Sequence, residues 1–259
     1  MSIQHFLSQI SGKPGSVILP NSDNWMQGRT LYGGASALVA YTQATRSFPE
    51  LPPLRAAQIG FVAPVGGDLH LESNIIRAGR NVTQVRSEIY HNDRLALTAL
   101  FLFAEPRDPN ALHQNKKPKN FPVSYEASEP MMQSKGPSFI RNNFELRRAQ
   151  DTSGPGEPIV RRWARLKNRA EVDIISELIL LGDVLPPGAM RAMQRQGPIS
   201  SINWSFNVLD TNPQTEDGWW VSENSSQHAD DGYSSERLRL WNTSGNQVVE
   251  AIQSVAIFG

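Results

Sequence analysis

Hydrophobic and polar residues alternate along four successive segments in the first half of the chain. Alternation with a period of two is typical of strands that bury one face. Gly, Pro, Asn and Asp occupy the breaks between the segments, as expected for tight turns. The pattern therefore predicts an antiparallel meander, with strands at Arg55–Ala63, Asp68–Ala78, Val82–His91 and Leu95–Ala104.

A helix is predicted before this meander, at Gly33–Phe48. Its small and apolar residues recur at helical spacing, and two glycines, Gly33 and Gly34, stand at its start. A short strand at Gly15–Pro20 precedes it.

The second half of the chain repeats this order. A helical region at about Glu171–Gln194 is followed by four more strand-like segments, and two short strands come first. The predicted strands are Phe144–Ala149, Pro158–Leu166, Ile199–Leu209, Gly218–Gln227, Gly232–Trp241 and Gln247–Phe258.

The segment Glu105–Pro137 separates the two halves. It is rich in Pro, Lys, Asn and Ser and has no hydrophobic period, so it is predicted to be a linker. The pattern as a whole predicts an α+β protein with domains at 1–104 and 138–259, joined by residues 105–137.

Composition removes several function classes. The 259 residues carry a formal net charge of zero, which argues against a nucleic-acid surface or an anionic membrane as partner. There is no cysteine, so disulfides and thiolate chemistry are excluded. The N-terminus lacks a signal-peptide pattern, and the apolar runs fall short of the roughly 20 residues that span a bilayer. We expect a cytoplasmic protein. The histidines do not have metal-ligand spacing, and we expect no metal or redox cofactor.

Two isolated polar residues suggest chemistry. Asp183 interrupts a long apolar helical pattern, and Gln253 is the single polar residue on the core face of the last predicted strand. A buried polar group costs free energy unless it has a partner, so a shared site would explain both residues. Pro186 and Pro187 lack N–H groups, so the helix should kink or restart just after Asp183.

The order of these motifs resembles the TesB-like, type II acyl-CoA thioesterases. The motifs that carry the resemblance are Leu31-Tyr32-Gly33-Gly34, Gly60-Phe61-Val62-Ala63-Pro64, Arg77-Ala78-Gly79-Arg80-Asn81, Asp183 with Pro186-Pro187, Ser201-Ile202-Asn203-Trp204, Asp231-Gly232-Tyr233 and Gln253. The resemblance implies a double hotdog, in which two antiparallel sheets each wrap a long central helix. It also implies hydrolysis of acyl-CoA thioesters, with coenzyme A as part of the substrate.

The resemblance further implies that Asp183, Ser201 and Gln253 hold a catalytic water. Ser200 is an alternative to Ser201, because a shift of one residue moves a side chain to the other sheet face. Burial should raise the pKa of Asp183 toward that of a useful general base. Residues 34–48 contain no carboxylate, so the second half alone would supply the base.

Substrate contacts are predicted at two further places. Gly33 and Gly34 could offer helix-start N–H groups to a thioester oxygen, or could simply allow close packing. Arg77, Gly79 and Arg80 could bind the phosphates of coenzyme A, or could form an ordinary hairpin with solvated arginines. We also expect a homodimer or a larger homo-oligomer, formed through edge strands.

Two other functions stay open. A protein of this fold could bind acyl-CoA or a lipid without catalysis. It could also be an enoyl-CoA hydratase-type protein, because Asp210-Thr211-Asn212-Pro213 partly matches the motif of that class; here, however, Gln214 follows where a His is needed, and a turn is the better interpretation. The run from Ser226 to Asp230 is not expected to form a triad, because neighbouring strand residues face opposite ways.

Overall fold

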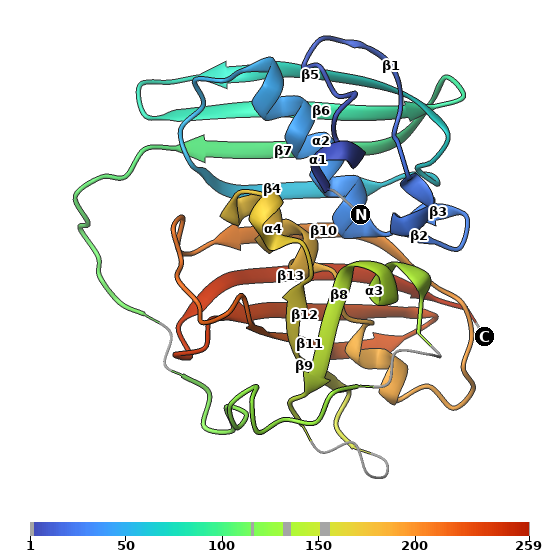
Figure 1. Ribbon diagram of the computed structural model, residues 1–259, viewed down its shortest axis with the longest axis vertical. Helices are drawn as coiled ribbons and strands as arrows, with labels where there is room; N and C mark the ends of the chain where they lie inside the picture. The colour runs from blue at the N-terminus through green and yellow to red at the C-terminus, as the bar shows by residue number, and fades with distance from the viewer. Residues whose placement is uncertain (1–2, 115–116, 132–135, 151–155, 259) are drawn as a thin grey trace.

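The computed structural model describes residues 3–114, 117–131, 136–150 and 156–258. Within these residues, eleven strands from both halves form one continuous antiparallel sheet, in the order β1-β5-β6-β7-β4-β10-β13-β12-β11-β9-β8 (Figure 1). The strands are β1 (Gly15–Ile18), β4 (Leu54–Phe61), β5 (Asp68–Ala78), β6 (Val82–His91), β7 (Arg94–Ala104), β8 (Phe144–Arg148), β9 (Ile159–Leu166), β10 (Ile199–Val208), β11 (Trp220–Asp230), β12 (Tyr233–Trp241) and β13 (Gln247–Ile257). Each strand predicted from the alternation is present, with ends that differ by up to three residues.

The two halves are joined edge to edge by β4 and β10. Asn203 to Asn207 of β10 pair with Gly60 to Ala56 of β4. The strands that were expected in two sheets therefore make one sheet, in which each half contributes its own continuous set of neighbours. A small second sheet pairs β2 (Met26–Gln27) with β3 (Thr30–Leu31).

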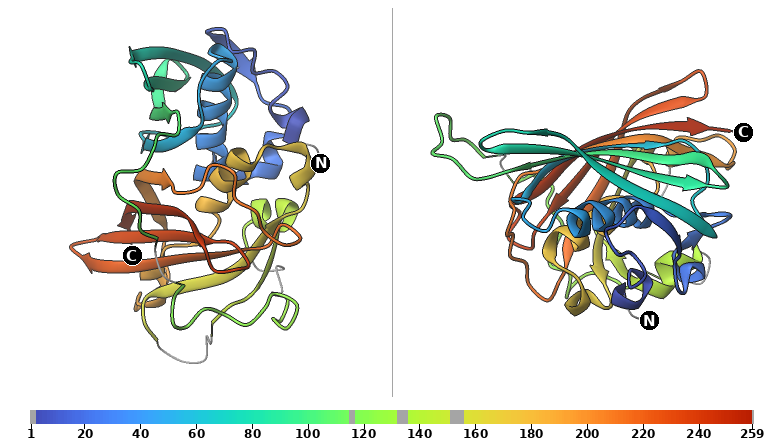
Figure 2. Two further views of the ribbon diagram at one scale, coloured as in Figure 1. Left: turned by 90° about the vertical axis from the view of Figure 1, so that its left-hand side faces the viewer. Right: turned by 90° about the horizontal axis from the view of Figure 1, so that it is seen from above.

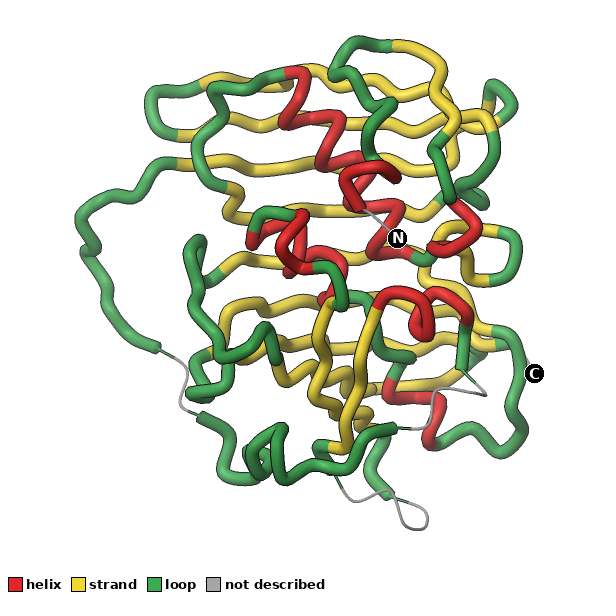
Figure 3. Tube along the Cα trace, viewed as in Figure 1, coloured by secondary structure: helices red, strands yellow, loops and turns green. Residues whose placement is uncertain are grey.

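The helices lie together on one side of the curved sheet (Figures 2 and 3). They are α1 (Ile3–Phe6), α2 (Gly33–Ser47), α3 (Ser138–Asn143), α4 (Ile174–Gly182) and the 3₁₀ turns η1 (Ser22–Trp25), η2 (Arg169–Glu171) and η3 (Gly188–Arg191). The main core lies between these helices and the sheet. None of the helices in the described part of the chain is long and apolar enough to cross a membrane.

The two principal helices differ in length. α2 runs for 15 residues and ends one residue before the predicted end, Phe48. α4 runs for only nine residues, so the expected helix to Gln194 is wrong in length. The predicted restart exists as η3, which is a single 3₁₀ turn. Pro186 and Pro187 lie between α4 and η3, and they cannot supply the N–H groups that a continuous helix would need.

The predicted linker is partly packed rather than free. Phe121 and Tyr125 contact a second, smaller hydrophobic cluster on the sheet face that points away from the helices. There Tyr125 stacks on Trp219, with 5.5 Å between ring centroids, and Trp163 donates a hydrogen bond to the backbone oxygen of Val123. The division of the chain into two domains stays a prediction.

Candidate active site

A cavity of about 980 Å³ lies between the two halves. The first half contributes the β2–β3 region, the start of α2 and the end of β4. The second half contributes residues of α3, β8 and β9, the segment after α4, the start of β10 and one residue of β13. The lining includes Gly33, Phe61, Asp183, Ser200, Ser201 and Gln253. Three segments that are far apart in sequence thus bring the predicted catalytic residues to one place.

Asp183 is the C-cap residue that follows the last residue of α4, Gly182. Its backbone leaves the helical region there, with φ −123° and ψ 20°, and its side chain reaches across to the start of α2 in the other half. Its carboxylate accepts a hydrogen bond from the backbone N–H of Gly34. The first N–H groups of a helix have no partner within the helix, so a carboxylate is well placed there.

Gln253 is the second partner of this carboxylate. Its Nε2 donates a hydrogen bond to Oδ1 of Asp183 at 3.0 Å, and its side chain is buried. Along β13 it lies on the same face as the buried Ala251 and Val255. The prediction that the two isolated polar residues meet is confirmed.

Gly33 lies against the other oxygen of the same carboxylate. A Cβ atom at Gly33 would lie 2.4 Å from Oδ2 of Asp183 and 3.0 Å from the ring of Phe61. A Cβ atom would displace one of them, because the carboxylate is held by its hydrogen bonds to Gln253 and Gly34, and Phe61 packs against the main core. The interpretation that Gly33 is needed for close packing is therefore supported directly.

Burial raises the pKa of Asp183 to about 6. Desolvation is the largest cause, and the hydrogen bonds from Gln253 and Gly34 lower the pKa by less. A carboxyl group that titrates just below neutral pH is ionised under ordinary conditions, yet is more basic than a solvated aspartate. The environment therefore suits a general base.

A β-bulge determines which of the two adjacent serines lies on the sheet face of Gln253. The β10–β13 register shifts between Ser201 and Asn203, so that Ser201 pairs with Val255 and Trp204 pairs with Gln253. Side chains of paired residues share a sheet face. Ser201 thus lies on the face of Val255 and Gln253, whereas Ser200 pairs with Ala256 on the other face. Without the bulge, strict alternation from the buried Trp204 would have turned Ser200 inward instead.

Arg77, Gly79 and Arg80 lie away from this cavity. Their hairpin joins β5 to β6 just before Val82, which pairs with Ala104 at the last residue of β7. The first residue of β4, Leu54, pairs with the adjacent Phe103, so the hairpin lies at the end of the sheet where β4 begins. The cavity is at the opposite end, where β4 finishes at Phe61. The prediction that these three residues contact the substrate is not supported within one chain, and the ordinary hairpin is the better interpretation.

Two buried residues that the sequence did not single out hold the segment after Asp183. Asn224 donates hydrogen bonds to the backbone oxygens of Leu185 and Pro186, at 2.9 and 3.1 Å. Glu236 accepts from the N–H groups of Gly188 and Ala189, at 2.7 and 3.2 Å. These contacts satisfy two carbonyl groups of the segment after α4 and the first two N–H groups of η3. The one available signal was the polar character of Asn224 and Glu236 on core faces of β11 and β12.

The segment Asp210–Pro213 is a turn, as predicted. Oδ1 of Asp210 accepts a hydrogen bond from the backbone N–H of Asn212 at 3.0 Å, which is a local turn contact. Asp210 is exposed and does not line the cavity. The hydratase interpretation therefore has no support from this motif.

Two family models match the chain. The model of the acyl-CoA thioesterase N-terminal domain matches residues 21–104, and the model of the C-terminal domain matches residues 119–257. A comparison with curated protein sequences found no match.

Solved structures share the fold along nearly the whole chain. A conserved protein of unknown function with a hot dog fold, from Alicyclobacillus acidocaldarius, is 14% identical, with a TM-score of 0.83 and 97% coverage of both chains. A protein of Thermobifida fusca YX, provisionally assigned as a thioesterase II, is 16% identical, with a TM-score of 0.81 and full coverage of both chains. The acyl-CoA thioesterase II TesB2 of Mycobacterium marinum is 14% identical, with a TM-score of 0.71 and coverage of 88% of this chain and 89% of the other. At these identities the likeness shows the hotdog fold.

Proposed function

Because the chain belongs to the acyl-CoA thioesterase family, a family of thioester hydrolases, we propose that it hydrolyses acyl-CoA by means of a water held by Asp183, Gln253 and Ser201. The observation that carries this proposal is the 3.0 Å hydrogen bond between Gln253 and Asp183 at the wall of a cavity. A structural cap would also place a carboxylate at a helix start. A cap does not need a cavity or a second buried polar partner from a distant strand.

The proposed reaction has two steps. Asp183 takes a proton from the water while the water oxygen attacks the thioester carbon, and the carbonyl oxygen becomes an oxyanion. The carbon–sulfur bond then breaks, and the proton taken up by Asp183 passes to the leaving coenzyme A sulfur. The products are the free acid and coenzyme A. This mechanism uses no metal and no redox cofactor.

The remaining polar groups have roles that follow from their bonding. The N–H of Gly34 is used by Asp183, so we assign the neighbouring helix-start N–H of Gly33 to the thioester oxygen. Gln253 holds the carboxylate through Nε2, and its side-chain oxygen can accept from the water. Ser201 is the third of the groups proposed to hold the water, and it lies on the same sheet face as Gln253.

We also propose that the hotdog fold of this chain is a double hotdog. Each half would be one unit, with α2 or α4 on the inner face of its own strands. The acyl chain would enter the cavity between the units, and a homodimer or larger homo-oligomer would form through an edge strand of the sheet such as β1.

Thiol release from a panel of acyl-CoAs, short to long and aromatic, tests the function. We expect wild-type turnover and a loss of about 10²- to 10⁴-fold in kcat for Asp183→Asn, because general-base catalysis contributes about that much. Asp210→Asn is the matched control: it is the acid of the hydratase interpretation and should keep wild-type turnover.

Circular dichroism and binding of a non-hydrolysable thioether analogue show whether each variant is folded and competent to bind. Near-wild-type hydrolysis by a folded Asp183→Asn protein would refute the assignment of the base. Binding without hydrolysis by the wild-type protein would favour the acyl-binding alternative.

A further inference from the structure

Arg162 is a cationic residue on the core face of β9. Side chains alternate along this strand, and Val160, Ala164 and Leu166 all belong to the main core between sheet and helices. Arg162 shares their parity, and it lines the cavity together with Val160, Leu146 and Met190. A half-buried guanidinium among apolar side chains needs a compensating charge.

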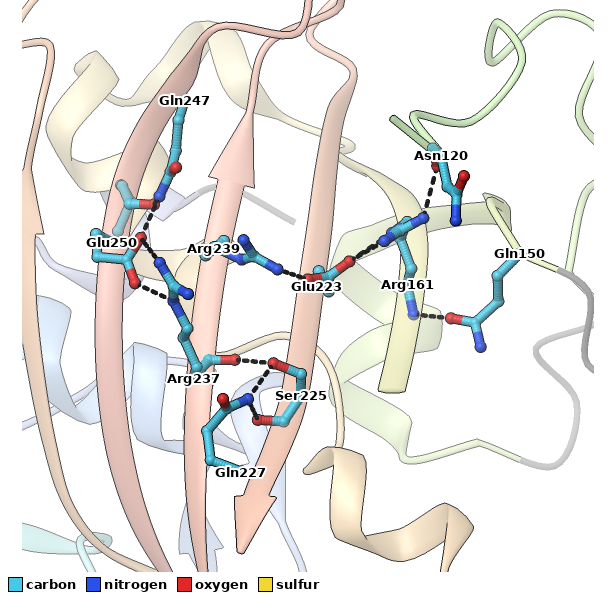
Figure 4. Close-up of polar contacts among 11 residues, drawn as sticks. Asn120, Gln150, Arg161, Glu223, Ser225, Gln227, Arg237, Arg239, Gln247 and Glu250 are labelled. Carbon is cyan, nitrogen blue, oxygen red and sulfur yellow. Dashed lines mark hydrogen bonds and ion pairs between the residues drawn. The ribbon is translucent and has the colours of Figure 1, made fainter. Parts of the chain in front are cut away.

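The neighbouring Arg161, in contrast, has a carboxylate that compensates its charge. It faces the other side of the sheet, where it forms an ion pair with the buried Glu223 of β11 (Figure 4). Arg239 of β12 contacts the second oxygen of the same carboxylate. On that face two guanidinium groups share one buried carboxylate.

Arg162 has no such carboxylate among the described residues. Its Nη1 donates to the backbone oxygen of Arg161 at 2.6 Å, and no ion pair includes it in that part of the chain. Its direct partner across the β8–β9 pair is another arginine, Arg148. Arg191 lies beside the same strand, with its Nη1 at 2.9 Å from the backbone oxygen of Ile159.

The electrostatic consequence is visible at Arg162. Burial, and then the charges of Arg148 and Arg191, lower the pKa of Arg162 to about 10. Arg162 thus carries its positive charge although burial and the neighbouring charges of Arg148 and Arg191 disfavour it. Arg148 is itself paired with Glu129, at 3.3 Å, and both of these side chains are largely exposed. An incoming anion would relieve the repulsion and could be bound by two N–H groups of Arg162 at once.

We propose that Arg162, with Arg148 and Arg191 beside it, forms a subsite of the cavity for an anionic group of the substrate. This inference rests on the proposed function, because the substrate is taken to be a thioester that enters this cavity. Two parts of a coenzyme A thioester carry suitable oxygens. One is a carboxylate at the far end of the acyl chain, and the other is a phosphate of coenzyme A.

Four substrates distinguish the two sources. Two acyl chains of equal length are used, one neutral and one that ends in a carboxylate. Each chain is attached to coenzyme A and, separately, to N-acetylcysteamine, a carrier without phosphate. If Arg162 binds the acyl carboxylate, Arg162→Met should lower kcat/KM about 10- to 100-fold for the carboxylated chain on both carriers. If it binds a phosphate, the same loss should follow both coenzyme A thioesters and spare both phosphate-free ones.

Arg165→Met is the matched control. Arg165 lies on the same strand but on the outer face, where it pairs with Glu145 at 2.7 Å. It should leave all four substrates within about twofold of wild type. Arg162→Lys keeps the charge but loses the forked geometry, and it should recover part of the loss. An equal effect of Arg162→Met on all four substrates, or none on any, would overturn the proposal.

Binding of thioether analogues, with and without the terminal carboxylate, separates this proposal from the proposed function. Calorimetric titration does not depend on turnover. If the wild-type protein hydrolyses none of the four thioesters but binds the charged analogue through Arg162, the subsite stands and the hydrolase mechanism fails. If the thioesters are hydrolysed and neither hydrolysis nor analogue binding depends on Arg162, the proposed function stands and the subsite fails.

Discussion

The two halves of the chain have the same order of elements but differently built inner faces. In the first half, the last strand, β7, turns Leu97, Ala99, Phe101 and Phe103 inward, and all four are buried and apolar. In the second half, the corresponding strand β13 has Gln253 in the middle of its inner face. The inner face of β7 is thus apolar throughout, whereas that of β13 carries a buried amide.

The two principal helices, α2 and α4, also differ in where polar groups bind them. α2 is continuous and has no acidic residue, and it offers its N-terminal N–H groups to the cavity. α4 ends at the residue before an acid, and the polar side chains of Asn224 and Glu236 bind the backbone that follows. Neither half alone forms the site. The second half supplies the carboxylate, and the first half supplies the helix start that binds it.

Replacement of Gly33 tests this division of roles most severely. In Gly33→Ala the new methyl group would lie 2.4 Å from Oδ2 of Asp183, so either the carboxylate or the start of α2 must move. A displacement of about 1 Å at a reacting group can cost about 100-fold in rate, and we expect a loss of that size in kcat/KM.

Gly79→Ala is the control for this substitution. Its new Cβ would approach only the backbone oxygen of Val82, at 3.3 Å, in the hairpin distant from the cavity. Activity should stay near wild type. A large loss in Gly79→Ala, with Gly33→Ala unaffected, would restore the hairpin as the substrate contact and remove Gly33 from the site.

Replacement of Gln253 by Leu makes the inner face of β13 resemble that of β7. The hydrogen bond from Gln253 lowers the pKa of Asp183, so its loss should raise that pKa further above about 6. Since the ionised form is the base, activity should rise with pH through the pKa in both proteins, and the acid limb of Gln253→Leu should lie at higher pH. We expect a loss of about 10- to 100-fold in kcat at pH 7.

The pH dependence of kcat from about pH 4 to 9 checks this prediction. Ile252, which lies on the opposite face of β13 and is exposed, provides the control variant Ile252→Gln. An acid limb that stays in place in Gln253→Leu would mean that Asp183 is not the group that titrates.

The sequence allowed prediction of the features that depend on local pattern. The strands follow from alternation, and Asp183 and Gln253 were found because each is a single polar residue in an apolar pattern. Prolines at 186 and 187 also indicated that the helix would be interrupted after Asp183. These signals are local, and tertiary contacts do not overrule them here.

Features that depend on register or on sheet ends could not be predicted. The choice of Ser201 over Ser200 depends on a β-bulge, which leaves the alternation ambiguous by one residue. Contact of Arg77 and Arg80 with the substrate stays a prediction, because a hairpin motif does not reveal at which end of the sheet the cavity opens. The inward position of Arg162 could not be predicted either, since composition does not distinguish one inward arginine from its outward neighbours Arg161 and Arg165.

A stability measurement gives the smallest expected effect and tests the same comparison without substrate. The pKa of Asp183 is about 6 in the folded protein and 3.8 when the side chain is solvated, so the folded state binds more protons between these values. The free energy of unfolding should therefore fall as pH rises from about 4 to 6, and the penalty should persist above pH 6. Asp183→Asn removes this penalty. We expect the variant to match wild type near pH 4 and to be about 1–2 kcal/mol more stable at pH 8. This is less than the free energy that corresponds to the full pKa shift, because the side chain keeps some exposure.

Urea unfolding at both pH values measures the difference, with Asp210→Asn as the exposed control. A variant that is less stable at pH 8 would mean that the ionised carboxylate mainly caps α2, and that the second half provides its charge for folding rather than for catalysis.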